Sequence, residues 1–141
     1  MGLNVELLRN SFDLVVARQP QVTPRFYEIL FSRYPQVKPL FGKNGAKQAE
    51  MLQQALVAVM EHLEDATWLT QTLEAMGGKH LDYGVTDEMY AMVGDSLLAT
   101  LAEIAGEDWT PELAAAWTDA YGAIAGLMQQ GAKKARASAA E

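Results

Sequence analysis

Apolar residues recur at spacings of three and four along almost the whole chain, and this helical period constrains the fold more than any other feature of the sequence. No extended stretch alternates strictly between apolar and polar side chains, as a half-buried strand would. We therefore expect an all-α protein. A chain of 141 residues, of which 50% are hydrophobic, is large enough for one domain with one buried core.

Prolines, glycines and capping residues divide this periodic pattern into six expected helices. Pro20 and Pro24 separate the first two, and we expect Thr23 to cap the second helix, with Pro24 at its first position. Thr67, Thr86 and Thr110 are the expected caps of the last three helices. We expect the first helix to end near residue 18. The other five are expected to span about 24–34, 46–64, 68–80, 87–106 and 111–131. We expect residues 1–132 to form the domain and 133–141 a disordered C-terminal tail.

Composition excludes several classes of function. The chain has no cysteine, so it can form no disulfide, thiolate metal site or cysteine nucleophile. A net charge of -7 disfavours binding to nucleic acid, which requires a basic surface. No segment approaches the roughly 18 apolar residues of a membrane span, and the start "MGLNVELLRNSF" has no signal-peptide pattern. We expect a cytoplasmic monomer or homodimer that binds no membrane.

Only two histidines occur, and their surroundings differ. His62 lies in the polar segment "MEHLEDA", where we expect it to be a solvated surface residue. His80 follows Leu73 and Met76 at helical spacing and ends an apolar stripe. On its own, such a position favours a core or boundary histidine over a metal ligand. A zinc site is not expected, because no second histidine stands at metal-ligand spacing.

Two further polar residues lie on apolar helix faces. Gln48 shares a face with Leu52 and is either a solvated glutamine of the first helical turn or a polar group at the head of an apolar row. Tyr27, in "RFYEILF", is either a boundary tyrosine whose hydroxyl reaches solvent or a donor aimed at a ligand. The local pattern leaves both alternatives open.

Five segments together resemble the globin domain of bacterial haemoglobins and flavohaemoglobins, in the same order and at similar spacing. They are "RFYEILFSRYPQVKPLF", Gln48 with Leu52, "KHLDYGV", "YAMVGDSLLATL" and "AAWTDAYGAIA". The resemblance covers about residues 3–130. It implies a globin fold with helices packed around a haem pocket, haem b (iron protoporphyrin IX) as cofactor, and dioxygen, nitric oxide and carbon monoxide as ligands.

The resemblance also implies roles for single residues. His80 would be the proximal ligand of the haem iron, which needs a neutral imidazole on one side and an open position on the other. Tyr27 and Gln48 would be the catalytic residues of the distal pocket, the phenol donating a hydrogen bond to dioxygen and the amide assisting it. The resemblance places the remaining residues against the haem as follows: Phe41 on its face, Leu52 in the distal pocket, Lys79 and Tyr83 near its edge, and Val85, Tyr90 and Val93 on the proximal side.

The sequence departs from the flavohaemoglobin pattern at one important position. In that family a glutamate on the last helix joins the proximal histidine to a tyrosine, here His80 and Tyr90. Alignment on "AWTDAYG" puts Gly131 or Ala132 at that position, so strong peroxidase-like chemistry is not expected. The chain also ends before the flavin and nicotinamide domains of that family, so a separate reductase is an expected partner.

Three functions follow from these expectations. The first is a haem protein that binds dioxygen reversibly and detoxifies nitric oxide with it. The second is a dedicated nitric oxide dioxygenase that works with a separate reductase, and the third is a haem-based redox or gas sensor. A helical interaction module without haem would keep the fold but show no haem absorbance.

Overall fold

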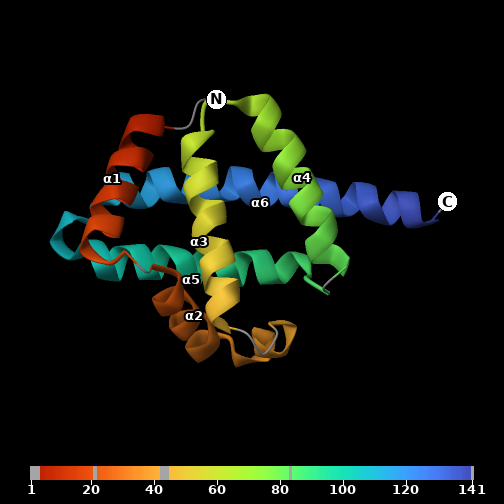
Figure 1. Ribbon diagram of the computed structural model, residues 1–141, viewed down its shortest axis with the longest axis horizontal. Helices are drawn as coiled ribbons and strands as arrows, with labels where there is room; N and C mark the ends of the chain where they lie inside the picture. Colours follow the sequence, from red (N-terminus) through yellow and green to blue (C-terminus); the bar gives the residue numbers. More distant parts are fainter. Residues whose placement is uncertain (1–3, 21, 42–44, 83, 141) are drawn as a thin grey trace.

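The computed structural model describes residues 4–20, 22–41, 45–82 and 84–140, and within these ranges it contains helices and no strand. Figure 1 shows the arrangement. In chain order the elements are α1 (Val5–Arg18), α2 (Val22–Arg33), the 3-10 helix η1 (Pro35–Leu40), α3 (Gly45–Glu61), α4 (Ala66–Asp82), α5 (Asp87–Ala105), the 3-10 helix η2 (Gly106–Asp108) and α6 (Pro111–Ala140). The expected all-α class is confirmed.

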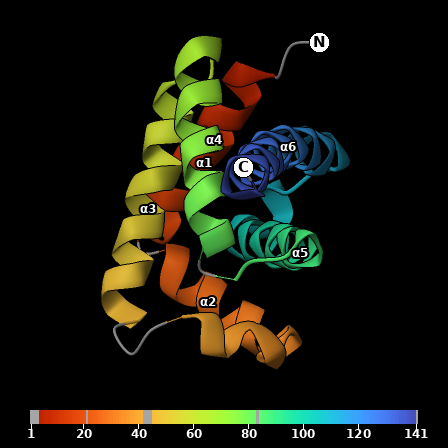
Figure 2. The same ribbon diagram turned by 90° about the vertical axis from the view of Figure 1, so that its right-hand side faces the viewer.

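The helices form two layers. α3 and α4 are antiparallel neighbours joined by the turn at residues 62–65, and α5 and α6 cross behind them (Figure 1). Figure 2 shows α5 and α6 nearly end-on beside the layer that α3 and α4 form. α4 packs chiefly against α6, whereas α2 packs against α5 and α3. No helix in the described ranges is both long and apolar enough to cross a bilayer.

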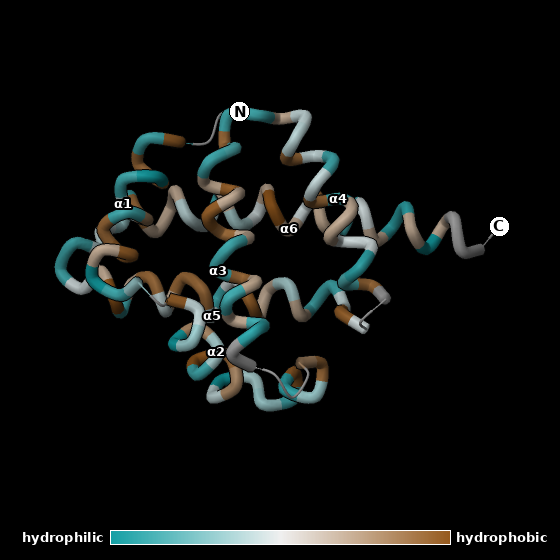
Figure 3. Tube along the Cα trace, in the orientation of Figure 1, coloured by the Kyte–Doolittle hydropathy of each residue, from teal (hydrophilic) through white to brown (hydrophobic). Residues whose placement is uncertain are grey.

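Apolar side chains at helical spacing build the core. Figure 3 shows hydrophobic and hydrophilic residues interspersed along the helices. Phe26 and Leu30 of α2, four residues apart, are fully buried, as is Leu101 of α5. A buried hydrogen bond crosses this core, because the indole nitrogen of Trp117 donates to the hydroxyl oxygen of Ser11 at 2.9 Å. Both α1 and α6 are thereby fixed against the same core.

Two ion pairs on the surface fasten α2 to α5. Arg25 holds the carboxylate of Glu103 with two nitrogens, at 2.6 and 2.7 Å. Arg33 contacts Asp95 at 2.8 Å, and the Tyr34 hydroxyl donates to the same carboxylate at 2.9 Å. All these side chains are at least partly exposed, so each pair alone stabilises the fold modestly.

Several expected helix ends are confirmed. α1 ends at Arg18, and α5 begins directly after Thr86 and ends at Ala105. Gly106 then takes a φ of +57°, in the left-handed region that favours glycine. Thr110 caps α6 as expected, because its hydroxyl oxygen accepts a hydrogen bond from the amide of Leu113 at 3.2 Å.

Two expected caps are wrong. α2 begins at Val22, so Thr23 lies inside the helix, and its hydroxyl donates to the carbonyl oxygen of Ala49 on α3. α4 begins at Ala66, so Thr67 also lies inside its helix, and the carboxylate of Asp65 accepts the hydrogen bond from the amide of Trp68 at 3.0 Å. At α4, Asp65 thus takes the capping role expected of Thr67.

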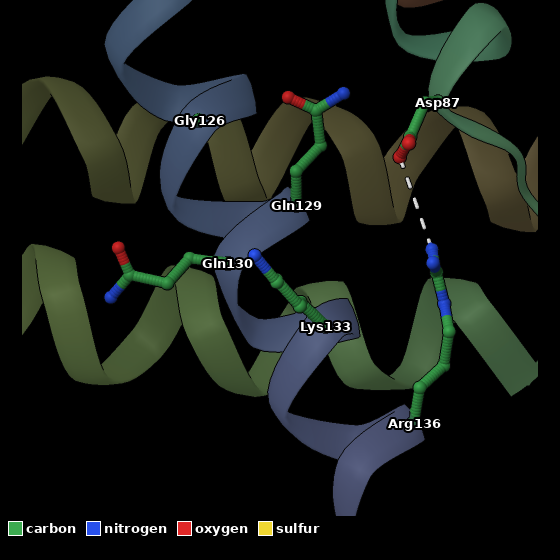
Figure 4. A pocket seen from close by; sticks show the side chains of 6 residues that line it. All are labelled: Asp87, Gly126, Gln129, Gln130, Lys133 and Arg136. Atoms are coloured by element: carbon green, nitrogen blue, oxygen red, sulfur yellow. Dashed lines mark ion pairs between the residues drawn. The ribbon is translucent and has the colours of Figure 1, made fainter.

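The last helix is longer than expected. We expected it to end near Gly131, but α6 runs on to Ala140. Glycine is a common helix terminator, yet Gly131 is buried against α4 and the helix passes through it. The C-terminal part of α6 lines a polar groove with Asp87, and Figure 4 shows Arg136 reaching Asp87, with 3.9 Å between the charged atoms. The division of the chain into a domain at 1–132 and a tail stays a prediction.

Candidate functional site

Two of the expected site residues, Gln48 and His80, lie at the same end of α3 and α4. Gln48 is in the first turn of α3 and His80 in the last turn of α4, so both lie at the end remote from the connecting turn at 62–65. α2 and η1 lie at this same end (Figure 1). Gln48 and His80 therefore lie at the same end of two helices that make few contacts with each other within the described residues.

Tyr27 belongs to an aromatic cluster at this end. Its ring centroid lies 5.1 Å from that of Phe26, 5.7 Å from that of Phe31 and 5.2 Å from that of Phe41. The residue is half-buried, and its hydroxyl makes no hydrogen bond within the described ranges. Burial raises the pKa of the phenol above its ordinary value, so the group stays protonated and remains a donor at neutral pH.

Gln48 and Leu52 are both half-buried on α3. Leu52 packs against the hydrophobic core, whereas Gln48 makes no hydrogen bond to another described residue. Gln48 is thus partly exposed in the first turn of α3, and both alternatives that the sequence allows for it stay open.

His80 is half-buried, and its ring orientation is fixed within α4. Its Nδ1 lies 2.7 Å from the carbonyl oxygen of Met76. A carbonyl oxygen only accepts, so this contact assigns a proton to Nδ1. Histidines that bind metals commonly have this arrangement, with one nitrogen donating to a carbonyl and the other ligating.

His62 is not the solvated residue that we expected. Its ring stacks on that of Trp68 with 3.9 Å between centroids, and its Nδ1 lies 2.7 Å from the carbonyl oxygen of Ala58. It also sits at the opposite end of the α3–α4 pair from His80. His62 is therefore a packing residue outside the site.

The remaining residues expected near the haem lie in α4, in α5 and in the segment between them. Val85 and Val93 are half-buried, and Val93 packs against the core from α5. Lys79 is exposed near the end of α4. Tyr83 lies outside the described residues.

Tyr90 is buried, and its environment is unusual. Its hydroxyl oxygen has no hydrogen-bond partner among the described residues. Its backbone carbonyl accepts a hydrogen bond from the Tyr121 hydroxyl at 2.6 Å, and the Tyr121 ring lies over Gly94, where an added Cβ would fall 2.5 Å from the ring. Burial, together with the nearby Asp87, raises the pKa of Tyr90, although Arg136 opposes the shift. The buried phenol therefore stays neutral.

The structure gives a physical reason for the missing proximal glutamate. A Cβ added to Gly131 would lie 1.9 Å from the carbonyl oxygen of Glu74, and one added to Gly77 would lie 1.8 Å from that of Met128. α4 and α6 thus cross with their backbones in direct contact. Ala132 is only 3% exposed. A glutamate at Gly131 would therefore require the two helices to move apart, and one at Ala132 would bring a carboxyl group into a buried position.

Sequence reasoning missed these glycine contacts. We expected no role for Gly77 from the sequence. A signal was present, however, because glycine inside a helix costs about 0.5–1 kcal/mol relative to alanine and therefore calls for a packing reason. No local sequence pattern predicts the hydrogen bonds that the Thr23 and Tyr121 hydroxyls make.

The available ligands fit a haem better than a bare metal ion. Within the described ranges no three His, Cys, Asp or Glu side chains cluster as an ion-binding group. The site instead offers one oriented imidazole together with half-buried apolar side chains from α2, α3 and α5. A porphyrin supplies the remaining ligands of its iron and needs an apolar slot. α3 packs chiefly on α2, and α4 packs chiefly on α6. The described residues of α3 and α4 make few contacts with each other.

Comparison with known proteins gives the same answer. The globin family model matches residues 24–128, and the chain belongs to the globin family. Its globin domain is similar to the flavohemoprotein of Bordetella pertussis, with 40% identity over 111 residues, which are 76% of this chain and 27% of that protein. The chain therefore spans about a quarter of the length of that relative. Membership of the family implies haem and diatomic gas ligands.

Two solved structures extend the comparison to the fold. An engineered carbene transferase, derived from a predicted nitric oxide dioxygenase of Rhodothermus marinus, superimposes with a TM-score of 0.85 and 27% identity, covering 97% of this chain and 96% of that one. A bacterial globin from Campylobacter jejuni gives a TM-score of 0.78 and 25% identity, covering 92% and 94%. The expected globin fold is confirmed.

Proposed function

We propose that this globin binds dioxygen and other diatomic gases reversibly at haem b held by His80, and that it consumes nitric oxide with dioxygen. The haem iron supplies the site at which the gas binds and the electron that the reaction requires. In the overall reaction, nitric oxide, dioxygen and one electron give nitrate. Each turnover therefore requires an electron from outside the globin domain.

The observation that carries this proposal is the state of the Tyr27 hydroxyl. Three aromatic rings pack around the phenol, burial raises its pKa further above neutral pH, and no described residue accepts its hydrogen bond. A preoriented donor beside an apolar slot favours a ligand that accumulates negative charge, as dioxygen does on a ferrous haem. Gln48, at the same end of the α3–α4 pair, supplies a second donor.

The other site residues have supporting roles in this proposal. His80 holds the iron through Nε2, since Nδ1 is engaged by Met76. Phe41 and Leu52 pack on the distal side of the haem, and Val85, Tyr90 and Val93 on the proximal side. Lys79 and Tyr83 lie near the haem edge.

The second candidate function makes nitric oxide dioxygenation the physiological role, with a separate reductase as partner. The similarity to flavohemoproteins and to the Rhodothermus marinus protein favours it. We expect the purified 141-residue chain to sustain nitrate formation only with an added reductase system. Steady nitrate formation on NADH alone would contradict this requirement.

Replacing Tyr27 by Phe tests the proposed oxygen site. The change keeps the ring packing and removes one hydrogen bond to a partly charged acceptor, worth about 1.5–3 kcal/mol. Stopped-flow measurement should therefore give oxygen release about 10 to 100 times faster than in the wild type. Gln48→Leu should act in the same direction. Carbon monoxide release is the control and should change little, because bound carbon monoxide carries much less charge. An unchanged oxygen release rate in Tyr27→Phe would refute the role of the phenol.

A further inference from the structure

A buried hydrogen bond joins the two helices that carry the distal residues. The Thr23 hydroxyl of α2 donates to the backbone carbonyl oxygen of Ala49 on α3 at 2.6 Å. Thr23 is 2% exposed and Ala49 6% exposed, so water does not compete for either group. A hydroxyl removed from water in this way needs its partner, and the bond therefore constrains the distance between the helices.

The start of α2 explains why this hydroxyl reaches across. Buried threonines inside helices commonly donate to a carbonyl one turn earlier in the same helix, as Thr100 does to Ser96 at 2.7 Å. Thr23 is the second residue of α2, so the residue four positions before it lies outside the helix. Its hydroxyl bonds to α3 instead.

The bond lies next to both proposed distal donors. Tyr27 follows Thr23 by four residues and so lies on the same face of α2, one turn along. Gln48 immediately precedes Ala49 on α3. The Thr23–Ala49 contact therefore sets the separation of the helices at the level where the phenol and the amide are attached.

We infer that Thr23 is a positioning residue for oxygen binding. Its hydroxyl holds α2 and α3 at the separation that lets Tyr27 and Gln48 act on one ligand together. The inference rests on the function proposed above. A methyl group in place of the hydroxyl would need a carbon-to-oxygen distance of about 3.3–3.6 Å. The helices would then move apart by several tenths of an ångström, and hydrogen bonds weaken steeply with such changes in geometry.

The test uses the haem-loaded full chain and three substitutions of Thr23. Val keeps the shape and removes the hydroxyl, Ala removes it without adding bulk, and Ser restores it. Thr100→Val is the matched control, because Thr100 is equally buried but its hydroxyl bonds within its own helix. Oxygen and carbon monoxide release are measured by stopped flow, and the C–O stretching band of the carbon monoxide complex by infrared spectroscopy.

We expect Thr23→Val to release oxygen about three to ten times faster than the wild type, the range that a single neutral hydrogen bond spans. Thr23→Ser should stay near the wild-type rate. The C–O band of Thr23→Val should move in the same direction as in Tyr27→Phe. In a chain that already carries Tyr27→Phe and Gln48→Leu, Thr23→Val should add less than about a twofold change, because there is then no donor left to misplace.

The outcomes separate this inference from the proposed function. If Tyr27→Phe accelerates oxygen release but both Thr23→Val and Thr23→Ala leave it unchanged, the positioning role is wrong and the oxygen site stands. The positioning role is also wrong if Thr100→Val has the same effect, or if Thr23→Val acts fully without the two donors, since either result indicates general loosening. If Tyr27→Phe itself has no effect, the proposed function fails first. Should Thr23→Val not fold, Thr23→Ala gives the same comparison.

Discussion

Gly131 on α6 lies directly against the backbone of Glu74 on α4, so close that an added Cβ would fall 1.9 Å from the Glu74 carbonyl oxygen. Replacing Gly131 by Ala should therefore force the two helices apart, and we expect it to lower the free energy of unfolding by at least about 2 kcal/mol. Gly126→Ala is the matched control on the same helix, because nothing lies within 4 Å of its added Cβ. It should stabilise the protein by up to about 1 kcal/mol through helix propensity. Urea unfolding of both variants measures the difference, and equal effects would contradict the close crossing.

The two tyrosines that meet at the α5–α6 contact should respond differently to loss of their hydroxyls. Tyr121→Phe removes the hydrogen bond to the Tyr90 carbonyl and should cost about 1 kcal/mol of stability. Tyr90→Phe removes a buried hydroxyl that has no partner, so it should be neutral or slightly stabilising. Denaturant unfolding of the haem-loaded protein compares them. A cost for Tyr90→Phe as large as that for Tyr121→Phe would mean that the Tyr90 hydroxyl finds an acceptor in solution.

The proposed iron ligand can be tested by removing one imidazole and supplying another. His80→Gly should lose the haem spectrum of the wild type, and added imidazole should restore it by entering the space that the side chain leaves. His62→Gln is the control and should keep the wild-type spectrum, because His62 stacks on Trp68 at the other end of the α3–α4 pair. If His80→Gly binds haem with an unchanged spectrum, with or without imidazole, another group is the ligand.

Acid should weaken the surface ion pairs that join α2 to α5 and α4 to α6. Hydrogen bonds from Arg25 lower the pKa of Glu103. Hydrogen bonds from Arg33, and to a lesser extent from Tyr34, lower the pKa of Asp95. A hydrogen bond from Lys134 lowers the pKa of Glu74. Because each pKa is lower in the folded than in the unfolded state, the stabilisation is complete above the ordinary carboxyl pKa values, 4.5 for Glu and 3.8 for Asp, and is lost as the pH falls through the folded values.

The expected result is a free energy of unfolding that begins to fall below about pH 4.5 and continues to fall toward lower pH. Glu103→Gln should make this dependence shallower, since it removes one of the titrating groups. Glu107→Gln, which changes an exposed carboxyl outside these ion pairs, is the control and should leave the slope nearly unchanged. Urea unfolding at several pH values gives the slopes, and identical slopes for Glu103→Gln and the wild type would refute the contribution of the Arg25 pair.

Local sequence signals predicted the local features of the fold. The period of three and four gave the helices, and the positions of Thr86, Gly106 and Thr110 gave the limits of α5 and the start of α6. These features depend on residues within one turn of each other, so they can be read along the chain. The position of His80 at the end of an apolar stripe was visible for the same reason.

The contacts that orient the candidate site were not predictable in this way. Thr23 was expected to cap its own helix, but its hydroxyl bonds to a residue 26 positions away. The competition between a local cap and a distant carbonyl is decided by how two helices pack, and no local pattern records that result. The expectation that Gly131 ends a helix failed in the same way. Its contact with the backbone of Glu74 exists only in the folded chain, so no local pattern reveals it.

The crossing of α4 and α6 also limits how this protein can evolve. A larger residue at Gly131, one of the two positions that align with the flavohaemoglobin glutamate, does not fit the crossing as it stands, because the first carbon of any side chain there meets the backbone of Glu74. A lineage that acquires a larger residue at Gly131 must widen the crossing, and this also alters the contact of Gly77 with the Met128 backbone. Substitutions at Gly77 and Gly131 are therefore expected to influence each other in evolution.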